Sequence, residues 1–432
     1  MHFYLLILLI CATPELLIID SPINDGVIPA ILAMAVAFAA RTIRPGQADY
    51  FFALARPIAV VAAIPAVWIF VQMLPLEIVG ISNPIWDSAS LGFERPIRGK
   101  ITIDPGITLL SLFRYLTMTA ILFLSMYVSL DRQRAEWVLI ALSTGTALTA
   151  LVLLGDEHAG ANFLFSTANA VPGIGALDSA ALGSVLASAN GIRAFERFET
   201  QRIKGNSIAA FAIALVFSII AFAVCALAIL LHATGYLILA AGSGLASLAV
   251  IVLIRRLAFG PWGCAAIGSV AIVIAISVLA MLPTARITPL TRPLAPQVSV
   301  PPASVSDRIL AASPWTGTGA GTFATLIPIY RDADEAVTEY SPPNVATKIA
   351  IEAGRPAVWT VLLIAIAAAA ALFRGSLRRG RDSFYSAAGA ACTVTLVVLA
   401  FTDVGALQTA TSVVASAALG LAFGQRLSRT TK

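Results

Sequence analysis

Charged residues are scarce in this chain. Only 12% of its 432 residues are Asp, Glu, Lys or Arg, whereas 59% are hydrophobic, and the mean hydropathy is +0.89. A soluble globular domain carries about 25% charged residues, so the composition excludes an ordinary water-soluble protein. Long apolar runs separated by short polar stretches predict an all-α fold: one integral membrane domain over 1–432, built as a polytopic helical bundle.

Cysteine and histidine are also rare, and their scarcity argues against most metal and redox chemistry. The four cysteines lie singly in apolar segments with no CxxC pair, which is typical of small packing residues in helices. The three histidines are His2, His158 and His232, and none pairs with acidic residues as a metal site would require. We therefore expect no metal and no other cofactor.

Basic residues are in modest excess, giving a net charge of +5. They fall between apolar runs, where basic residues set the orientation of membrane helices, so we expect no nucleic-acid partner. The short loops 41–56 and 374–382 and the C-terminus each carry several basic residues, namely Arg41, Arg44 and Arg56, then Arg374, Arg378, Arg379 and Arg381, then Arg426, Arg429 and Lys432. Because short basic loops stay in the cytoplasm, the sequence predicts cytoplasmic termini and places 77–105, 155–205 and 283–356 outside.

The apolar runs predict about 12 spans, with 10 as the alternative. The runs are 3–19, 25–43, 57–76, 107–130, 137–154, 206–254, 258–282, 357–373, 384–403 and 407–423. If residue 205 is outside and Arg255 is cytoplasmic, 206–254 must cross an odd number of times. Three crossings would have about 16 residues each, or about 24 Å, which is short but feasible in a thinned bilayer.

The connection 283–356 is too long to be a simple linker. A proline-rich start is followed by short helix candidates and by SPWTGTGAGTF (313–323), with Gly317, Gly319 and Gly321 at alternate positions. The dinucleotide fingerprint G-x-G-x-x-G does not fit this spacing, and no strand–helix unit surrounds it. Two readings remain open: the glycines let the backbone turn tightly against helix ends, or their N–H groups face an anion.

The same connection carries a resemblance to a known family. PWTGTGAGTF followed by PNVATKIAIEAGRPAVW resembles the external loop of the O-antigen ligase and polysaccharide polymerase superfamily, with Asn344, Glu352 and Gly354 on the family pattern. RIKGNSIAAF (202–211) and ITIDPGITLLSLFRYL (101–116) resemble other segments of that superfamily. The ligase histidine before the asparagine is Pro343 here, so a polymerase-like or diverged member fits better than a standard ligase.

The resemblance implies a glycosyltransferase of polysaccharide assembly in the bacterial inner membrane. Its donor would be a polyprenyl-diphosphate-linked glycan, and its acceptor a glycan or lipid A-core. Membrane lipids and polysaccharide assembly proteins would be its other partners. In this reading 283–356 is a long periplasmic loop, and cations meet the diphosphate, since arginine suits phosphate.

Several residues are candidates for this chemistry. We expect Glu352 and Arg202 to be catalytic: Glu352 as a base where the histidine is missing, and Arg202 at a span entrance. The candidates for substrate binding are Lys204, Asn206, Arg98, Arg114, Gly317, Gly319, Gly321, Arg331, Asn344 and Lys348. Structural alternatives remain for two of these residues, because Glu352 could pair with Arg355 and Arg114 could reach toward the headgroups.

Two other classes of function stay open. A transporter of polysaccharide or lipid-linked sugar would place ionisable groups inside the bundle, and Arg114 and Asp403 come nearest to that description. A catalytically inactive scaffold would explain the missing histidine. Transfer from a lipid-linked donor by purified protein separates the enzyme from both alternatives.

Overall fold

The computed structural model describes residues 1–14, 22–75, 82–158, 173–201, 208–232, 235–257, 305–331, 342–379 and 382–426. All regular secondary structure in these ranges is helical, which confirms the all-α prediction. The expected span 258–282 and the proline-rich stretch that follows it lie outside the described residues.

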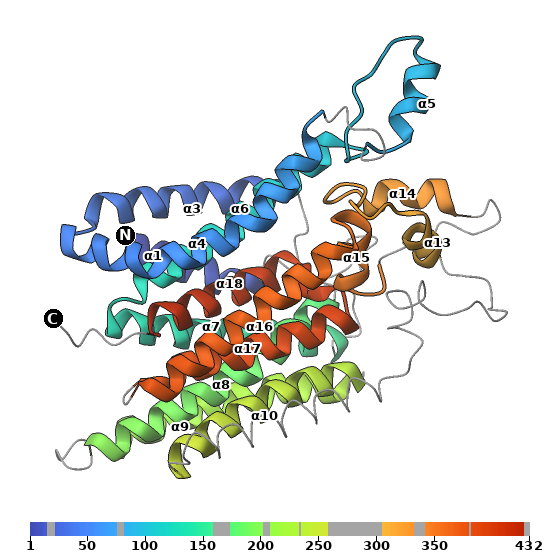
Figure 1. Ribbon diagram of the computed structural model, residues 1–432. Helices are drawn as coiled ribbons and strands as arrows, with labels where there is room; N and C mark the ends of the chain where they lie inside the picture. Colours follow the sequence, from blue (N-terminus) through green and yellow to red (C-terminus); the bar gives the residue numbers. More distant parts are fainter. Residues whose placement is uncertain are drawn as a thin grey trace.

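Seven of the described helices are long and apolar enough to cross a membrane (Figure 1). They are α4 (Pro45–Met73), α6 (Pro105–Val128), α7 (Arg132–His158), α9 (Ile208–Leu231), α10 (Gly235–Leu257), α16 (Arg355–Arg378) and α17 (Ser383–Thr402). The other helices are α1 (His2–Cys11), α3 (Pro22–Thr42), α5 (Ile85–Gly92), α8 (Gly173–Gln201), α13 (Val305–Ala312), α14 (Phe323–Tyr330), α15 (Val345–Glu352) and α18 (Thr409–Gly424). A 3-10 turn, η3 (Gly405–Leu407), precedes α18.

The long helices run between two ends of the bundle that differ in chemistry. We call one the glycine-loop end, because α13, α14 and α15 pack there around residues 313–323 (Figure 1). We call the other the basic end, because arginines from α7, α8, α10 and the α16–α17 connection meet there. Both described termini lie at the basic end: His2 contacts Arg134, and Gln425 accepts a hydrogen bond from Arg379.

Helix α8 corrects the prediction that 155–205 is an external connection. It is 29 residues long and crosses the bundle from the glycine-loop end to the basic end. Its sequence is rich in Ala, Gly and Ser rather than in large apolar residues, and most of its side chains are buried against other helices. A Cβ at Gly183 would lie only 2.6 Å from Thr146 Oγ1 on α7, so small residues let these helices approach closely.

The segment 206–254 contains two helices, α9 and α10, and the expected three crossings are wrong. The reason lies in α8, since it returns the chain to the basic end before α9 begins. Arg255 at the end of α10 donates to Glu196 near the end of α8 at 3.0 Å, so these two segments share one end. Two helices of 24 and 23 residues each have a comfortable spanning length.

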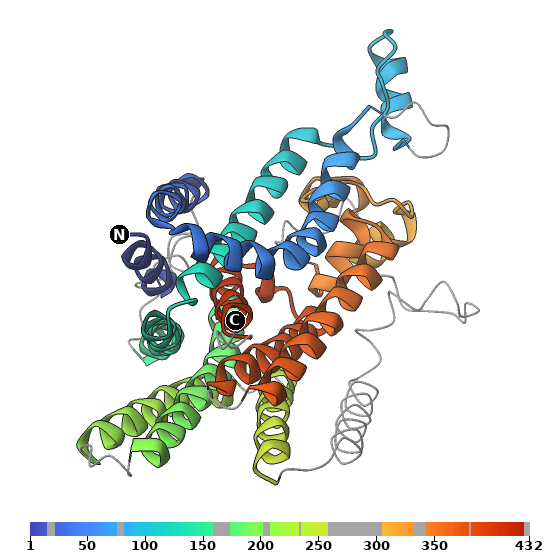
Figure 2. The ribbon, with the colours of Figure 1, turned by 60° about the vertical axis from the view of Figure 1, so that its left-hand side comes forward.

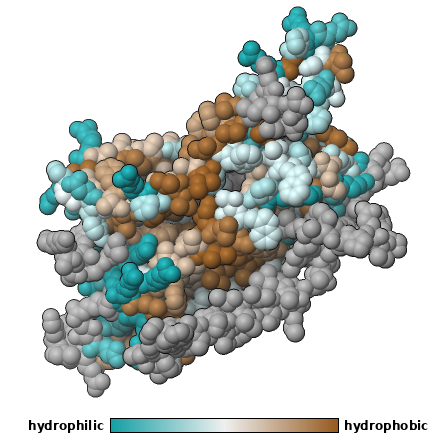
Figure 3. Space-filling model, viewed as in Figure 1, coloured by the Kyte–Doolittle hydropathy of each residue, from teal (hydrophilic) through white to brown (hydrophobic). Residues whose placement is uncertain are grey.

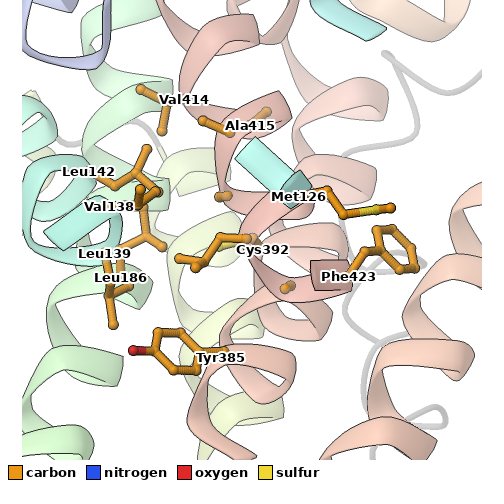
Figure 4. Close-up of a cluster of buried hydrophobic side chains, with 14 of the residues drawn as sticks. Met126, Val138, Leu139, Leu142, Leu186, Tyr385, Cys392, Val414, Ala415 and Phe423 are labelled. Carbon is orange, nitrogen blue, oxygen red and sulfur yellow. The ribbon is translucent and has the colours of Figure 1, made fainter. Parts of the chain in front are cut away.

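The main apolar core lies where α7, α8, α17 and α18 meet, with Leu139, Leu186, Cys392 and Val414 among its members (Figure 4). Helices α1 and α3 pack on one side of this centre and α16 on another (Figure 2). The surface carries a broad apolar area across the middle, with hydrophilic residues concentrated toward the ends and on the projecting α5 (Figure 3). This pattern suits a lipid-facing belt between two polar faces.

Candidate functional site at the glycine-loop end

The short helix α15 is fixed at its start by Asn344. The Asn344 side chain caps the helix by accepting the N–H of Thr347 at 2.7 Å, and its Nδ2 donates to the carbonyl of Phe401 at 3.1 Å. The N–H of Val345 donates to the Asp403 carbonyl at 2.9 Å. Asn344 is only 2% exposed, so both ends of its amide serve the protein rather than open solvent.

The glycines of the loop are required by the backbone and by its neighbours. Gly317, Gly319 and Gly321 have φ of +83°, +111° and +83°, values that side chains rarely allow. A Cβ at Gly319 would overlap Thr102, one at Gly321 would overlap Ser111 on α6, and one at Gly317 would overlap the end of α15. The loop therefore packs closely against the segment from Thr102 to Ser111, which includes the start of α6, and against the end of α15.

The N–H groups of this loop already have partners inside the protein. Thr318 donates to the Ile351 carbonyl, Gly319 to the Glu352 carbonyl, Ala320 to Gln72 Oε1, Thr322 to the Gly319 carbonyl, and Gly321 and Phe323 to the Glu352 carboxylate. The first of the two readings, tight turning against helix ends, is thus what the geometry displays. The N–H groups that we expected to face a substrate anion are engaged by internal acceptors.

Glu352 is the anion that the loop surrounds. Its side chain is 8% exposed, and Phe323 N donates to its Oε1 at 3.2 Å. Burial raises the pKa of the Glu352 carboxyl above its usual value, while Lys348 one turn earlier and the N–H groups of Gly321 and Phe323 oppose that rise. A carboxyl whose pKa is raised holds a proton more readily than an exposed carboxyl, which keeps a role as base chemically open.

Gln72, at the end of α4, is a residue that sequence reasoning missed. Its side chain is fully buried, and Nε2 donates to the Glu352 carbonyl at 2.9 Å and to the Thr316 carbonyl at 3.2 Å. Its Oε1 accepts the Ala320 N–H, so one amide joins α4, α15 and the glycine loop. The available signal was a single amide side chain near the end of an otherwise apolar run.

The expected cations are spread over this end rather than gathered at one point. Arg98 is exposed on the segment 82–104, Arg331 is exposed just after α14, and Lys348 is half-buried on α15. Arg114 is exposed on α6 and lies about one turn after Ser111, the residue of that helix against which Gly321 packs. Arg355 stacks on Trp315 at 5.3 Å and donates to the Leu310 carbonyl at 3.3 Å.

Three expected site residues, Arg202, Lys204 and Asn206, lie outside the described residues. The helices on either side of them, α8 and α9, end and begin at the basic end. Arg193 and Arg197, which we expected outside with the glycine loop, both pair with Glu136 at the basic end, and that expectation is wrong. The unforeseen crossing by α8 is the physical reason.

A buried pair of acids lies close beneath α15. Asp178 on α8 is 0% exposed, and neither of its carboxylate oxygens has a hydrogen-bond partner among the described residues. Asp403, between α17 and η3, is 6% exposed and interacts electrostatically with Asp178. The start of α8 is held there by Thr411 Oγ1, which donates to the Gly175 carbonyl at 2.9 Å. Two buried acids that interact in this way repel each other when both are charged, which is why their burial stands out among the described residues.

In comparisons with known proteins, no protein-family model matches the chain, and no curated protein matches it. Within the described ranges, the His, Cys, Asp and Glu side chains form no group of three or more that could hold a metal ion. The function is therefore argued from the geometry of the glycine-loop end and from the resemblance of its sequence.

Proposed function

We propose that the protein is a membrane-embedded glycosyltransferase of bacterial surface polysaccharide assembly. In this proposal it polymerises or ligates glycan from a polyprenyl-diphosphate-linked donor at the glycine-loop end, which faces the periplasm. The observation that carries the proposal is the platform formed by residues 313–323 and α15 over the ends of α4 and α6. These are the residues that resemble the external loop of the O-antigen ligase and polymerase superfamily.

Arg114 gives the platform a cation at the depth of a lipid headgroup. Gly321 packs against Ile107 and Ser111 of α6, and Arg114 follows Ser111 by three residues, about 4.5 Å along the helix axis. A polyprenyl diphosphate keeps its chain in the bilayer and its charge at the membrane face. In our proposal Arg114 meets that diphosphate and stabilises the negative charge that grows as the sugar leaves.

A carboxylate completes the reaction. The acceptor hydroxyl attacks the anomeric carbon, the bond to the diphosphate breaks, and the hydroxyl proton passes to a base. Glu352 is our candidate base, because its pKa is raised by burial and because Lys348 lies one turn away. Its engagement by the loop N–H groups implies that the acceptor reaches it only when 319–323 moves away from α15.

The test is transfer of glycan from a polyprenyl-diphosphate donor to an acceptor by purified protein in liposomes. We expect Arg114→Gln to slow transfer about 100-fold, the usual effect of removing one group that stabilises a developing charge. Arg41→Gln, which removes an exposed cation at the far end of α3, is the matched control and should transfer at the wild-type rate. Glu352→Gln tests the candidate base, and the double variant Arg202→Gln, Glu352→Gln should be no slower, because the helices that flank residue 202 end and begin at the basic end.

The outcomes separate the classes of function. If transfer is unchanged in Arg114→Gln and in the double variant, the assigned residues are wrong although the activity is right. If the wild-type protein transfers nothing, and a strain lacking it keeps its polysaccharide length and its lipid-linked intermediates, the glycosyltransferase proposal fails. An inactive scaffold or a transporter would then be favoured.

A transporter of lipid-linked sugar or polysaccharide is our second candidate, and the buried pair Asp178–Asp403 favours it. Acids inside a helical bundle often exchange a proton or a cation during transport. In a transporter, Asp178→Asn should abolish substrate-dependent proton uptake into liposomes. In a glycosyltransferase the same variant should leave the rate of transfer within a few-fold of wild type.

A further inference from the structure

The basic end contains buried hydrogen-bond donors that have no acceptor among the described residues. Tyr385 Oη, Ser383 Oγ and Ser386 Oγ belong to the first turn of α17, and each of these residues is at most 1% exposed. Arg193 Nε on α8 and Arg379 Nη1 after α16 are likewise without a partner. We call these five groups the α17 donor cluster. A buried donor without an acceptor costs about 1–3 kcal/mol, so five together need an explanation.

Three members of the cluster, Tyr385, Arg193 and Arg379, are linked by charge, and Ser383 and Ser386 share the first turn of α17 with Tyr385. Arg193 Nη1 donates to Glu136 at 2.8 Å, and Tyr385 interacts electrostatically with both Arg193 and Arg379. The Tyr385 hydroxyl points from α17 toward α8, the helix that carries Arg193 (Figure 4). The aromatic ring thus lies among the core residues while its polar atom reaches the charged groups.

Positive charge exceeds negative charge around these donors. Glu136 pairs with Arg193 and Arg197, and Asp382 pairs with Arg132 at 2.7 Å and with Arg379 at 3.9 Å. Four guanidinium groups therefore share two carboxylates. Arg132 and Arg197 are partly exposed, so the excess positive charge lies at the edge of the bundle, where it attracts a further anion.

The start of α17 is a second feature that favours an anion at this place. Its N-cap residue, Asp382, makes no side-chain capping hydrogen bond and has a left-handed φ of +60°. The first N–H groups of a helix have no partner within the helix, and they carry partial positive charge. An anion placed there would cap α17 and would also accept hydrogen bonds from the side-chain donors.

We infer that the α17 donor cluster binds a phosphate group at the basic end of the bundle. Phosphate oxygens are acceptors only, and arginine forks and hydroxyls are the groups that bind them best. Arg132 and Arg197, whose carboxylate partners also pair with Arg379 and Arg193 of the cluster, have side chains that are 52% and 37% exposed, so a ligand reaches this region from the side of these two arginines. The phosphate comes from an anionic phospholipid headgroup or from free phosphate, and both would present the same oxygens.

The test uses the full chain in dodecyl maltoside, a detergent without phosphate. Unfolding is followed by the reaction of Cys225 and Cys392 with a thiol-reactive dye, since both thiols are buried in the folded protein. Phosphatidylglycerol is titrated in one arm and inorganic phosphate in the other, with sodium chloride at matched ionic strength as the reference. We expect a saturable rise in melting temperature in at least one phosphate arm and none with chloride.

Tyr385→Phe is the decisive variant, because it removes a hydroxyl that has no partner in the described structure. Without phosphate it should melt at or above the wild-type temperature, and its half-saturating phosphate or lipid concentration should rise about tenfold. Tyr115→Phe is the matched control: its hydroxyl donates to the Ala62 carbonyl at 2.7 Å. That control should lower the melting temperature and leave half-saturation unchanged.

The two arms also assign the source of the phosphate. Saturation by inorganic phosphate alone identifies a soluble ligand, whereas a response only to phosphatidylglycerol identifies a lipid headgroup. Equal responses to phosphate, lipid and chloride would overturn the inference. So would a half-saturating concentration that is the same in Tyr385→Phe and wild type. None of these readouts depends on glycan transfer, so the outcome is separate from that of the proposed function.

Discussion

At the glycine-loop end, the N–H groups of Thr318, Gly319 and Phe323 all donate to the end of α15, and a single glutamate supplies an internal anion. At the basic end, the hydroxyl of Tyr385 and the Nε of Arg193 are just as buried but have no acceptor. Both ends gather polar groups at the boundary of an apolar bundle. The glycine loop closes its backbone hydrogen bonds within the chain, whereas the start of α17 leaves donors without an acceptor in the described structure.

This contrast shows that a motif does not reveal its ligand by residue type alone. Alternating glycines looked like a place for phosphate, yet the N–H groups of Gly319 and Gly321 donate to the protein's own Glu352, and that of Gly317 donates to the Pro314 carbonyl. Arg379 belongs to a basic loop that we used only to predict orientation, yet it interacts with Tyr385, whose buried hydroxyl has no partner in the described structure. The decisive quantity is whether each buried donor has an acceptor.

The glycine-loop end should be the less tolerant of added atoms. Among the variants considered, Gly319→Ala should cause the largest loss of stability. Its φ of +111° disfavours any side chain, and a Cβ would overlap Thr102. We expect a loss of stability of about 3 kcal/mol from strain and overpacking together. Gly46→Ala in α4 is the control, since nothing lies within 4 Å of its Cβ position. Thermal unfolding with and without phosphate checks both variants, and equal effects would show that the loop is not tightly packed.

Gln72→Ala should have the next largest effect. It removes the amide that joins α4 to the loop and leaves the Ala320 N–H and the Thr316 carbonyl without their partner. We expect a loss of about 2 kcal/mol, because buried groups lose their hydrogen bonds. Gln47→Ala, an exposed glutamine of the same helix, should change stability by less than about 0.5 kcal/mol. A tolerated Gln72→Ala would mean that the two ends do not differ as described.

The sequence predicted the helical class and, to within two residues, the bounds of α6 and α17, because these helices are apolar over nearly their whole length. It placed the start of α4 at residue 57 rather than at Pro45, because the first turns of that helix carry polar and charged residues. It failed on α8, whose Ala, Gly and Ser residues meet other helices rather than lipid and so lack the hydropathy of a span. It grouped Glu352, Gly354 and the loop glycines correctly through the resemblance. It could not find Gln72 or Asp178, because a single polar residue in a helix shows its importance only through its neighbours.

The cap of α15 offers a smaller test of how firmly the glycine-loop end is tied together. Asn344→Ala removes the cap on Thr347 and the bond to Phe401, whereas Asp104→Ala removes only the cap of α6. Loss of a cap costs about 1 kcal/mol, and the second bond should bring the Asn344 variant to about 2 kcal/mol. Thermal unfolding of both variants in one detergent measures the difference. Equal losses would indicate that the bond to α17 contributes nothing.

The smallest expected effect concerns the internal anion itself and its response to pH. Burial raises the pKa of Glu352 above the ordinary value of 4.5, so the unfolded chain releases this proton at a lower pH than the folded protein does. The folded state then binds more protons, and stability falls as the pH rises from about 4.5 through the pKa of the folded protein. Glu352→Gln should lack this part of the pH dependence.

Melting temperatures measured from pH 4 to pH 8 therefore compare three proteins. The stability of wild type relative to Glu352→Gln should decline with rising pH, and Lys348→Gln should steepen that decline, because Lys348 favours the charged carboxylate. Parallel curves for wild type and Glu352→Gln would mean that the loop N–H groups and Lys348 fully offset the burial of Glu352. In that case the charged form of Glu352 would be as stable in the folded protein as it is in water, and a raised pKa could no longer support a role as base.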